Sequence, residues 1–187
     1  MKNKIFEPFK IKDIVFLAIL SAVTLCTCCV MLHVIFFPPV IFGIAQLVTG
    51  LQISVFFAIG LMKIPKTGAL FLMSLFTGLF QVTMAPPMFF SNIIIGILLE
   101  VFAVIVFKGF KSEKAVFITV LLYNPLSLPF NLLYNYLFGR EAMVAVVTKT
   151  PWLTVVMVLA IIAISALGAW IGIKISKELR KSGAMKH

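Results

Sequence analysis

Charged side chains are scarce in this chain, and acidic ones are the scarcest. Only six of 187 residues are Asp or Glu, and 12% of the residues are charged, whereas about a quarter of an ordinary soluble domain is charged. Apolar residues make up 62% of the chain and come in long runs, and the mean hydropathy is +1.16. This composition excludes an ordinary soluble domain. It predicts an all-α integral membrane protein with a single transmembrane domain, 1–187.

The motifs of several enzyme classes are also missing. The sequence contains no G-x-x-x-x-G-K-[ST], no H-E-x-x-H and no G-x-S-x-G, which excludes ATP hydrolysis by a phosphate-binding loop and two common hydrolytic chemistries. The two histidines are His33 and His187. We therefore expect no catalytic residue, no metal and no cofactor.

Cysteine is rare and confined to one run. Cys26, Cys28 and Cys29 all lie in the first apolar run, which argues against a disulfide framework. The second ligand pair of a closed metal site is absent, so these residues are expected to behave as small hydrophobic side chains. No cleavage pattern precedes this run, and we expect it to be retained.

Six apolar runs are long enough to cross a bilayer, which takes about 20 residues in a helix. We expect six transmembrane helices at about residues 14–35, 40–62, 67–85, 88–107, 115–138 and 151–175. Pro151 suits the first turn of the last helix. Pro125 and Pro129 lie inside the fifth run, where they predict a kink or a break.

The basic residues predict the orientation. With six spans, 14 of the 16 Lys and Arg residues fall on the side of both termini, and only Arg140 and Lys149 fall on the other. Because short cytoplasmic loops carry the excess of positive charge, both termini are expected in the cytoplasm. The protein is expected to be a multi-pass protein of the bacterial plasma membrane. The net charge of +10 is therefore a topology signal and does not indicate nucleic-acid binding.

Neutral polar residues gather toward the opposite, extracellular side of the spans. Amides are costly in hydrocarbon unless they find partners, and single ones commonly join helices. Five amides at one depth, from four spans, predict the wall of an outward-facing cavity, with aromatic residues at its rim. These amides are Gln46, Gln81, Asn92, Asn131 and Asn135. The predicted substrate-binding residues are His33, Phe37, Gln46, Gln81, Asn92, Asn131, Tyr134, Asn135, Arg140 and Trp152. Amides and aromatic rings favour a planar heterocycle that is neutral or carries one negative charge.

Two further features stand out within the spans. Ala18 and Ala22, with Ser21 beside them, make one helix face unusually small, which permits close approach of another helix, either within this protein or from a separate docking partner. Glu100 is the one carboxylate well inside a span. It either meets water or Lys108 near the inner surface, or it is a buried acid that pairs with a polar partner or bears on coupling.

The chain as a whole resembles a known family. Its length, six spans, cytoplasmic termini, short N-terminal segment and Ala18-x-x-x-Ala22 together resemble the substrate-binding (S) components of energy-coupling factor (ECF) transporters. Lys-Ile-Lys-Asp-Ile at residues 10–14, Lys-Ile-Pro-Lys-Thr-Gly at residues 63–68 and Thr-Pro-Trp at residues 150–152 look most like the MptD-like (Trep_Strep) branch.

The resemblance implies a substrate-capture subunit of an ABC importer. Such a protein binds a vitamin-like micronutrient outside the cell and docks, through the alanine face, to a coupling membrane protein driven by two ATPases. The alternative from another class is a self-sufficient small transporter or channel, for which inverted repeats or pathway charges would be expected. A third alternative is an intramembrane enzyme.

Overall fold

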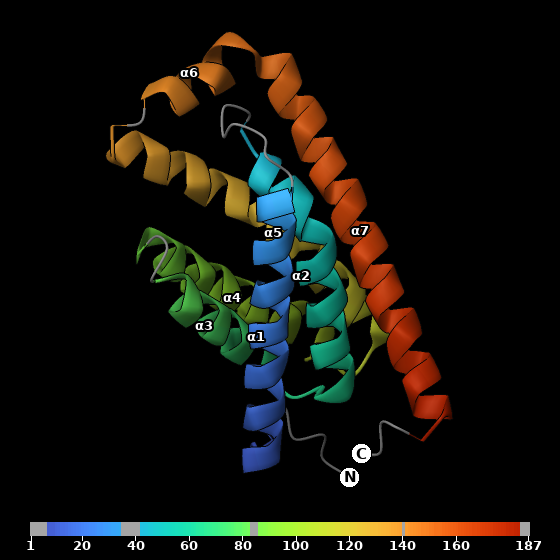
Figure 1. Cartoon of the computed structure of the whole chain (residues 1–187). Coiled ribbons are helices and arrows are strands. Elements are labelled where there is room, and N and C mark those ends of the chain that lie inside the picture. Colours follow the sequence, from blue (N-terminus) through green and yellow to red (C-terminus); the bar gives the residue numbers. More distant parts are fainter. Residues whose placement is uncertain (1–6, 35–41, 83–85, 140, 184–187) are drawn as a thin grey trace.

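The computed structural model describes residues 7–34, 42–82, 86–139 and 141–183, and these residues form seven α-helices (Figure 1). In chain order they are α1 (Ile11–Val34), α2 (Ile44–Lys63), α3 (Ala69–Gln81), α4 (Pro86–Phe107), α5 (Glu113–Leu137), α6 (Glu141–Lys149) and α7 (Pro151–Lys181). Helices are the form expected of apolar runs in lipid, because a helix satisfies its own backbone hydrogen bonds. The all-helical prediction is confirmed for the described residues.

Five helices are long and apolar enough to cross a membrane: α1, α2, α4, α5 and α7. The remaining apolar helix, α3, has 13 residues and rises about 20 Å, less than the roughly 30 Å of a hydrocarbon core. The sixth span, expected at residues 67–85, is therefore not confirmed. The predicted orientation of the termini remains a prediction.

Two segments differ from expectation in local structure. Residues 139–150, expected as a polar connection, contain the nine-residue helix α6. The fifth run is one continuous helix through Pro125 and Pro129, so α5 has no break there, and the alternative of a kink stays a prediction. Pro151 does occupy the first turn of α7, as predicted.

The core is organised around α2, which contacts α1, α3, α5 and α7. Its closest neighbour is α7, because two glycines let the backbones approach. A Cβ atom on Gly168 would lie 2.7 Å from the carbonyl oxygen of Leu51, and one on Gly172 would lie 2.5 Å from that of Val55. Both spacings are too short for a side chain, so Gly168 and Gly172 set the distance between α2 and α7.

The helix ends define two ends of the bundle. The start of α1 and the end of α7 both lie at the bottom of Figure 1, whereas α6 lies at the top. We call the bottom the basic end, because ion pairs of Lys66, Lys111 and Lys177 lie there. In Figure 1, α3, α4 and the C-terminal half of α5 extend to the left of α1.

Candidate functional site

Two of the predicted binding amides meet through a direct hydrogen bond. Asn92, in the first half of α4, donates from Nδ2 to Oε1 of Gln81 at 2.7 Å and to the carbonyl oxygen of Met88 at 2.6 Å. The Asn92 Oδ1 accepts from the hydroxyl of Tyr123 on α5 at 2.7 Å. Asn92 therefore links α3, α4 and α5, and its hydrogen-bonding capacity is largely used within the protein.

The second pair of amides lies near the end of α5. Asn135 is 5% exposed, and its Nδ2 donates to the backbone oxygen of Asn131 at 2.8 Å and to the Oδ1 of Asn131 at 2.6 Å. The Asn135 Oδ1 is buried and accepts no hydrogen bond from any residue that the structure describes. A buried acceptor left without a donor is costly, so a ligand donor group that reached this atom would be stabilised.

The other predicted binding residues are more scattered. Gln46 is half-buried in the first turn of α2, and the half-buried ring of Tyr134 lies 4.6 Å from the ring of Phe138. Trp152 is 68% exposed, so the structure does not enclose it in a site. His33 falls in the last turn of α1, whereas Phe37 and Arg140 lie outside the described residues.

Sequence reasoning missed two polar residues in the middle of α5. Asn124 is 2% exposed, and its Nδ2 donates to the hydroxyls of Ser54 on α2 and Ser165 on α7, both at 3.1 Å, and to the Gly50 carbonyl oxygen at 3.2 Å. Its neighbour Tyr123 bonds Asn92. The signal in the sequence was Tyr-Asn-Pro inside an otherwise apolar run, which contributes polar groups to both sides of α5.

The predicted docking residues separate into buried and accessible positions on α1. Leu17, Ser21 and Thr24 are fully buried, and the Ser21 hydroxyl lies 3.4 Å from the carbonyl oxygen of Met73 on α3, a long hydrogen bond. Ser21 is thus an internal packing residue, which corrects its assignment to a docking face. Ala18 and Ala22 are half-buried at the edge of this contact.

The accessible side of α1 continues the alanine spacing with cysteine. Ala18, Ala22, Cys26 and Cys29 follow one another at helical spacing, and all four are partly or fully exposed. We call these four residues the small-residue face. Cys28 faces the other way and is buried. Small side chains at such positions permit close backbone approach by another helix in lipid.

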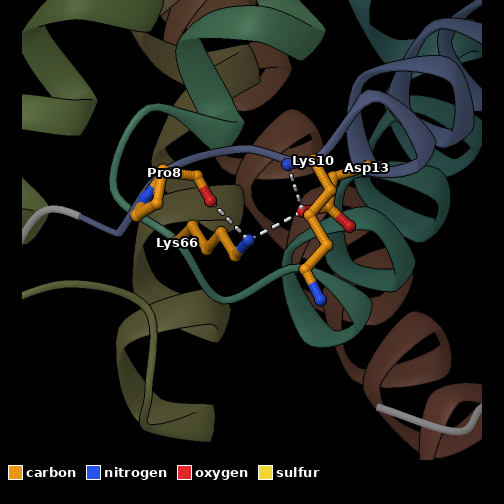
Figure 2. Close-up of polar contacts among 4 residues, drawn as sticks. All are labelled: Pro8, Lys10, Asp13 and Lys66. Carbon is orange, nitrogen blue, oxygen red and sulfur yellow. Dashed lines mark hydrogen bonds and ion pairs between the residues drawn. The ribbon is translucent and has the colours of Figure 1, made fainter.

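The base of α1 is held by a cluster at the basic end. Lys66, in the turn before α3, places its Nζ 2.7 Å from Oδ2 of Asp13 and 2.8 Å from the carbonyl oxygen of Pro8 (Figure 2). The backbone N–H of Lys10 donates to the same Asp13 oxygen at 3.1 Å. This contact joins residues 10–14 to residues 63–68, two of the segments on which the family resemblance rests.

Glu100 has a structural partner beside this cluster. Its Oε1 accepts from the backbone N–H of Gly68 at 2.6 Å, and its Oε2 accepts from that of Phe71 at 3.1 Å. A carboxylate at a helix N-terminus satisfies backbone donors and interacts favourably with the helix dipole. Glu100 therefore caps α3, which confirms the prediction of a buried acid with polar partners; a bearing on coupling stays a prediction.

Described residues form two cavities at the basic end. One of about 310 Å³ lies beside Glu100 and Gly68, and one of about 540 Å³ lies between the start of α5 and the end of α7. None of the predicted substrate-binding residues lines either cavity.

Comparison with known proteins identifies the family. No curated protein and no solved structure matches the chain significantly. The family model of Trep_Strep, described as a hypothetical bacterial integral membrane protein, matches residues 11–179, which include all five membrane-spanning helices except the last two residues of α7. The chain therefore belongs to the Trep_Strep family of bacterial integral membrane proteins and is a multi-pass protein of the cell membrane.

Proposed function

We propose that this protein is the substrate-capture subunit of an ECF-type ABC importer. Membership in a family of bacterial integral membrane proteins suggests a role related to membrane transport. The finer assignment has two parts. The chain binds a small micronutrient at the end opposite the basic end, and it docks through α1 to a coupling membrane protein that is driven by two ATPase subunits.

The observation that carries the proposal is the unsatisfied Oδ1 of Asn135. This acceptor is buried near the end of α5 and accepts no hydrogen bond from a described residue. A ligand N–H or O–H would remove the cost of leaving it unpaired. The half-buried Asn131 and Tyr134 lie within the same turn and supply further polar and aromatic contacts for a planar heterocycle that is neutral or carries one negative charge.

The docking part is supported by how little of α1 is buried. A single stripe along this helix packs against α2 and α3, and the small-residue face lies at the edge of that stripe. In lipid, apolar surface alone gives helices no reason to associate, whereas close packing of small residues does. The coupling protein is the proposed partner of this face.

The rival function, a self-sufficient transporter or channel, needs charged or polar groups along a pathway. Glu100 was the candidate pathway charge, and both of its oxygens are engaged by the backbone of α3. This favours the capture subunit. Adjacent genes for a coupling membrane protein and paired ATPases would favour it further.

The capture claim is tested by identifying the bound molecule. Protein purified from cells grown in rich medium is denatured, and the released small molecules are identified by mass spectrometry. We expect one planar heterocycle in stoichiometric amount. Substitution Asn135→Leu is expected to weaken its binding by about 1–3 kcal/mol, whereas Tyr136→Phe, at an adjacent position that is 69% exposed, is expected to leave binding unchanged. Release of only a polyamine or a bare transition metal would contradict the proposal.

A further inference from the structure

The larger cavity at the basic end has a charged rim. Its polar lining consists of Glu113 and Lys114 from the first turn of α5, and Lys174 and Lys177 from the last turns of α7. Three lysines and one glutamate leave a net charge of +2 at neutral pH. The Lys177 Nζ lies 2.8 Å from Oε2 of Glu113, so this pair is neutral overall and joins the two helices across the cavity.

Two cations remain for a ligand. Lys174 places its Nζ 5.0 Å from the centre of the Trp170 ring, a cation–π contact that orients the ammonium group without neutralising it. Lys114 is exposed and forms no ion pair with any residue in the described ranges. It also lies in the first turn of α5, where the helix dipole favours an anion.

The remaining wall of the cavity is apolar. Phe117, Ile118, Trp170 and Ile173 line it, and Trp170 and Ile118 are 54% and 36% exposed. On a membrane-spanning helix, apolar side chains exposed beside lysines are typical of the level where acyl chains meet headgroups. A soluble anion would use only the rim, whereas a lipid would use both the rim and the wall.

We propose that this cavity, between the start of α5 and the end of α7, is a binding site for an anionic glycerophospholipid. The phosphate lies between Lys114 and Lys174, and the first part of one acyl chain lies against Phe117, Ile118 and Trp170. A volume of about 540 Å³ is in the range of small-molecule sites. By the positive-inside rule the basic end faces the cytoplasm, the side on which anionic lipids attract juxtamembrane lysines.

The site is tested with the tryptophan that lines it. The chain has two tryptophans, so Trp152→Phe leaves Trp170 as the sole indole. The purified full chain is placed in phosphatidylcholine bilayers containing a small fraction of lipid brominated high on its acyl chains, and quenching of Trp170 is measured. Brominated phosphatidylglycerol is expected to quench more efficiently than brominated phosphatidylcholine, with an apparent preference of roughly fivefold or more, the gain typical of one lysine near an anionic headgroup.

Matched lysine variants separate a site from general surface charge. The double variant Lys114→Gln and Lys174→Gln is expected to abolish the preference. The control, Lys12→Gln and Lys108→Gln, removes two exposed lysines elsewhere on the chain and is expected to retain it. Normalising each variant to its own quenching by phosphatidylcholine removes the direct effect of Lys174 on Trp170 emission.

Three results would overturn the proposal. They are equal quenching by the two lipids, a preference that survives in the Lys114 and Lys174 variant, and a preference lost equally in the control. An acidic protein segment in the cavity would give the first of these, because the purified chain alone would then show no lipid preference. The measurement needs neither substrate nor transporter partners, so it is independent of the proposed import function.

Discussion

Two helices that flank α2 in Figure 1 each carry a small-residue step, which is a pair of small residues four positions apart, and the two helices use it differently. On α7 the step is Gly168-x-x-x-Gly172, and on α1 it is Ala18-x-x-x-Ala22. The glycines of α7 are buried against the backbone of α2. The alanines of α1 are half-buried, and the small-residue face to which they belong continues onto the exposed side of that helix.

The two pairs differ because the small residues of α7 already pack against another helix of the same protein, whereas those of α1 are only partly covered. On α7, lack of a side chain permits close contact with α2, and Asn124 secures the contact through Ser54 and Ser165. On α1, the ion pair of Asp13 with Lys66 holds the base, and the internal contact leaves the step partly open. A larger side chain at the occupied step of α7 should lower the stability of the protein. A larger side chain at the open step of α1 should instead impair assembly with a partner.

The largest effect is expected from Gly172→Leu. A Cβ here would lie 2.5 Å from the carbonyl oxygen of Val55, so the side chain must push α7 away from α2. We expect the free energy of unfolding in detergent to fall by about 3 kcal/mol, the upper part of the range for overpacking. The control Ala163→Leu, at an exposed position of α7, should change it little. Equal effects of the two variants would show that the glycine step does not set the α2–α7 distance.

A smaller loss is expected from Asn124→Leu. This change removes the donor shared by Ser54, Ser165 and the Gly50 carbonyl oxygen and leaves buried acceptors unpaired. The expected cost is about 1–3 kcal/mol in unfolding free energy, and Tyr136→Phe on the exposed side of α5 is the control. A cost equal to that of the control would mean that the α2–α5–α7 contact depends on packing alone.

The base of α1 should contribute less. The side chains of Lys66 and Asp13 are 17% and 22% exposed, and partly exposed ion pairs contribute modestly. A double-mutant cycle of Lys66→Ala and Asp13→Ala is expected to give a coupling energy of about 0.5–1 kcal/mol. Strictly additive single effects would exclude this pair as an anchor of α1.

The smallest change in stability is expected at the open step. Because Ala22 is half-buried at the edge of the α1 contact, Ala22→Leu should alter the free energy of unfolding by no more than about 0.5 kcal/mol. Thermal unfolding of the isolated protein in detergent provides the check. A loss as large as that of Gly172→Leu would place Ala22 in the internal core.

The sequence was sufficient for features that depend on long apolar runs. The predicted spans at 14–35, 88–107 and 151–175 overlap α1, α4 and α7, because twenty apolar residues in lipid have few alternatives to a helix. Proline at the start of α7 was equally predictable. The 13-residue length of α3 was not, since its apolar run continues beyond the helix end.

The faces of the helices were harder to predict than their existence. Ala18, Ser21 and Ala22 were grouped by spacing, yet Ser21 lies toward α3 and the alanines lie at the edge. A one-residue step turns a helix by about 100 degrees, so only the neighbours decide which side is buried. The same reason hid the role of Gly168 and Gly172, and also that of Asn124, whose three partners come from two other helices.

The central claim is that the small-residue face of α1 docks a coupling partner, and a split between uptake and binding tests it most directly. Cells depending on the ligand identified by mass spectrometry would carry Ala22→Trp or the control Val23→Trp, one residue away and 41% exposed. The account predicts that Ala22→Trp abolishes uptake and that Val23→Trp retains it. Both purified proteins are expected to bind the ligand normally. The reason is that a large side chain at position 22 pushes the partner helix away from α1 but does not reach the proposed binding amides on α5. Uptake that survives Ala22→Trp, or ligand binding lost together with uptake, would contradict it.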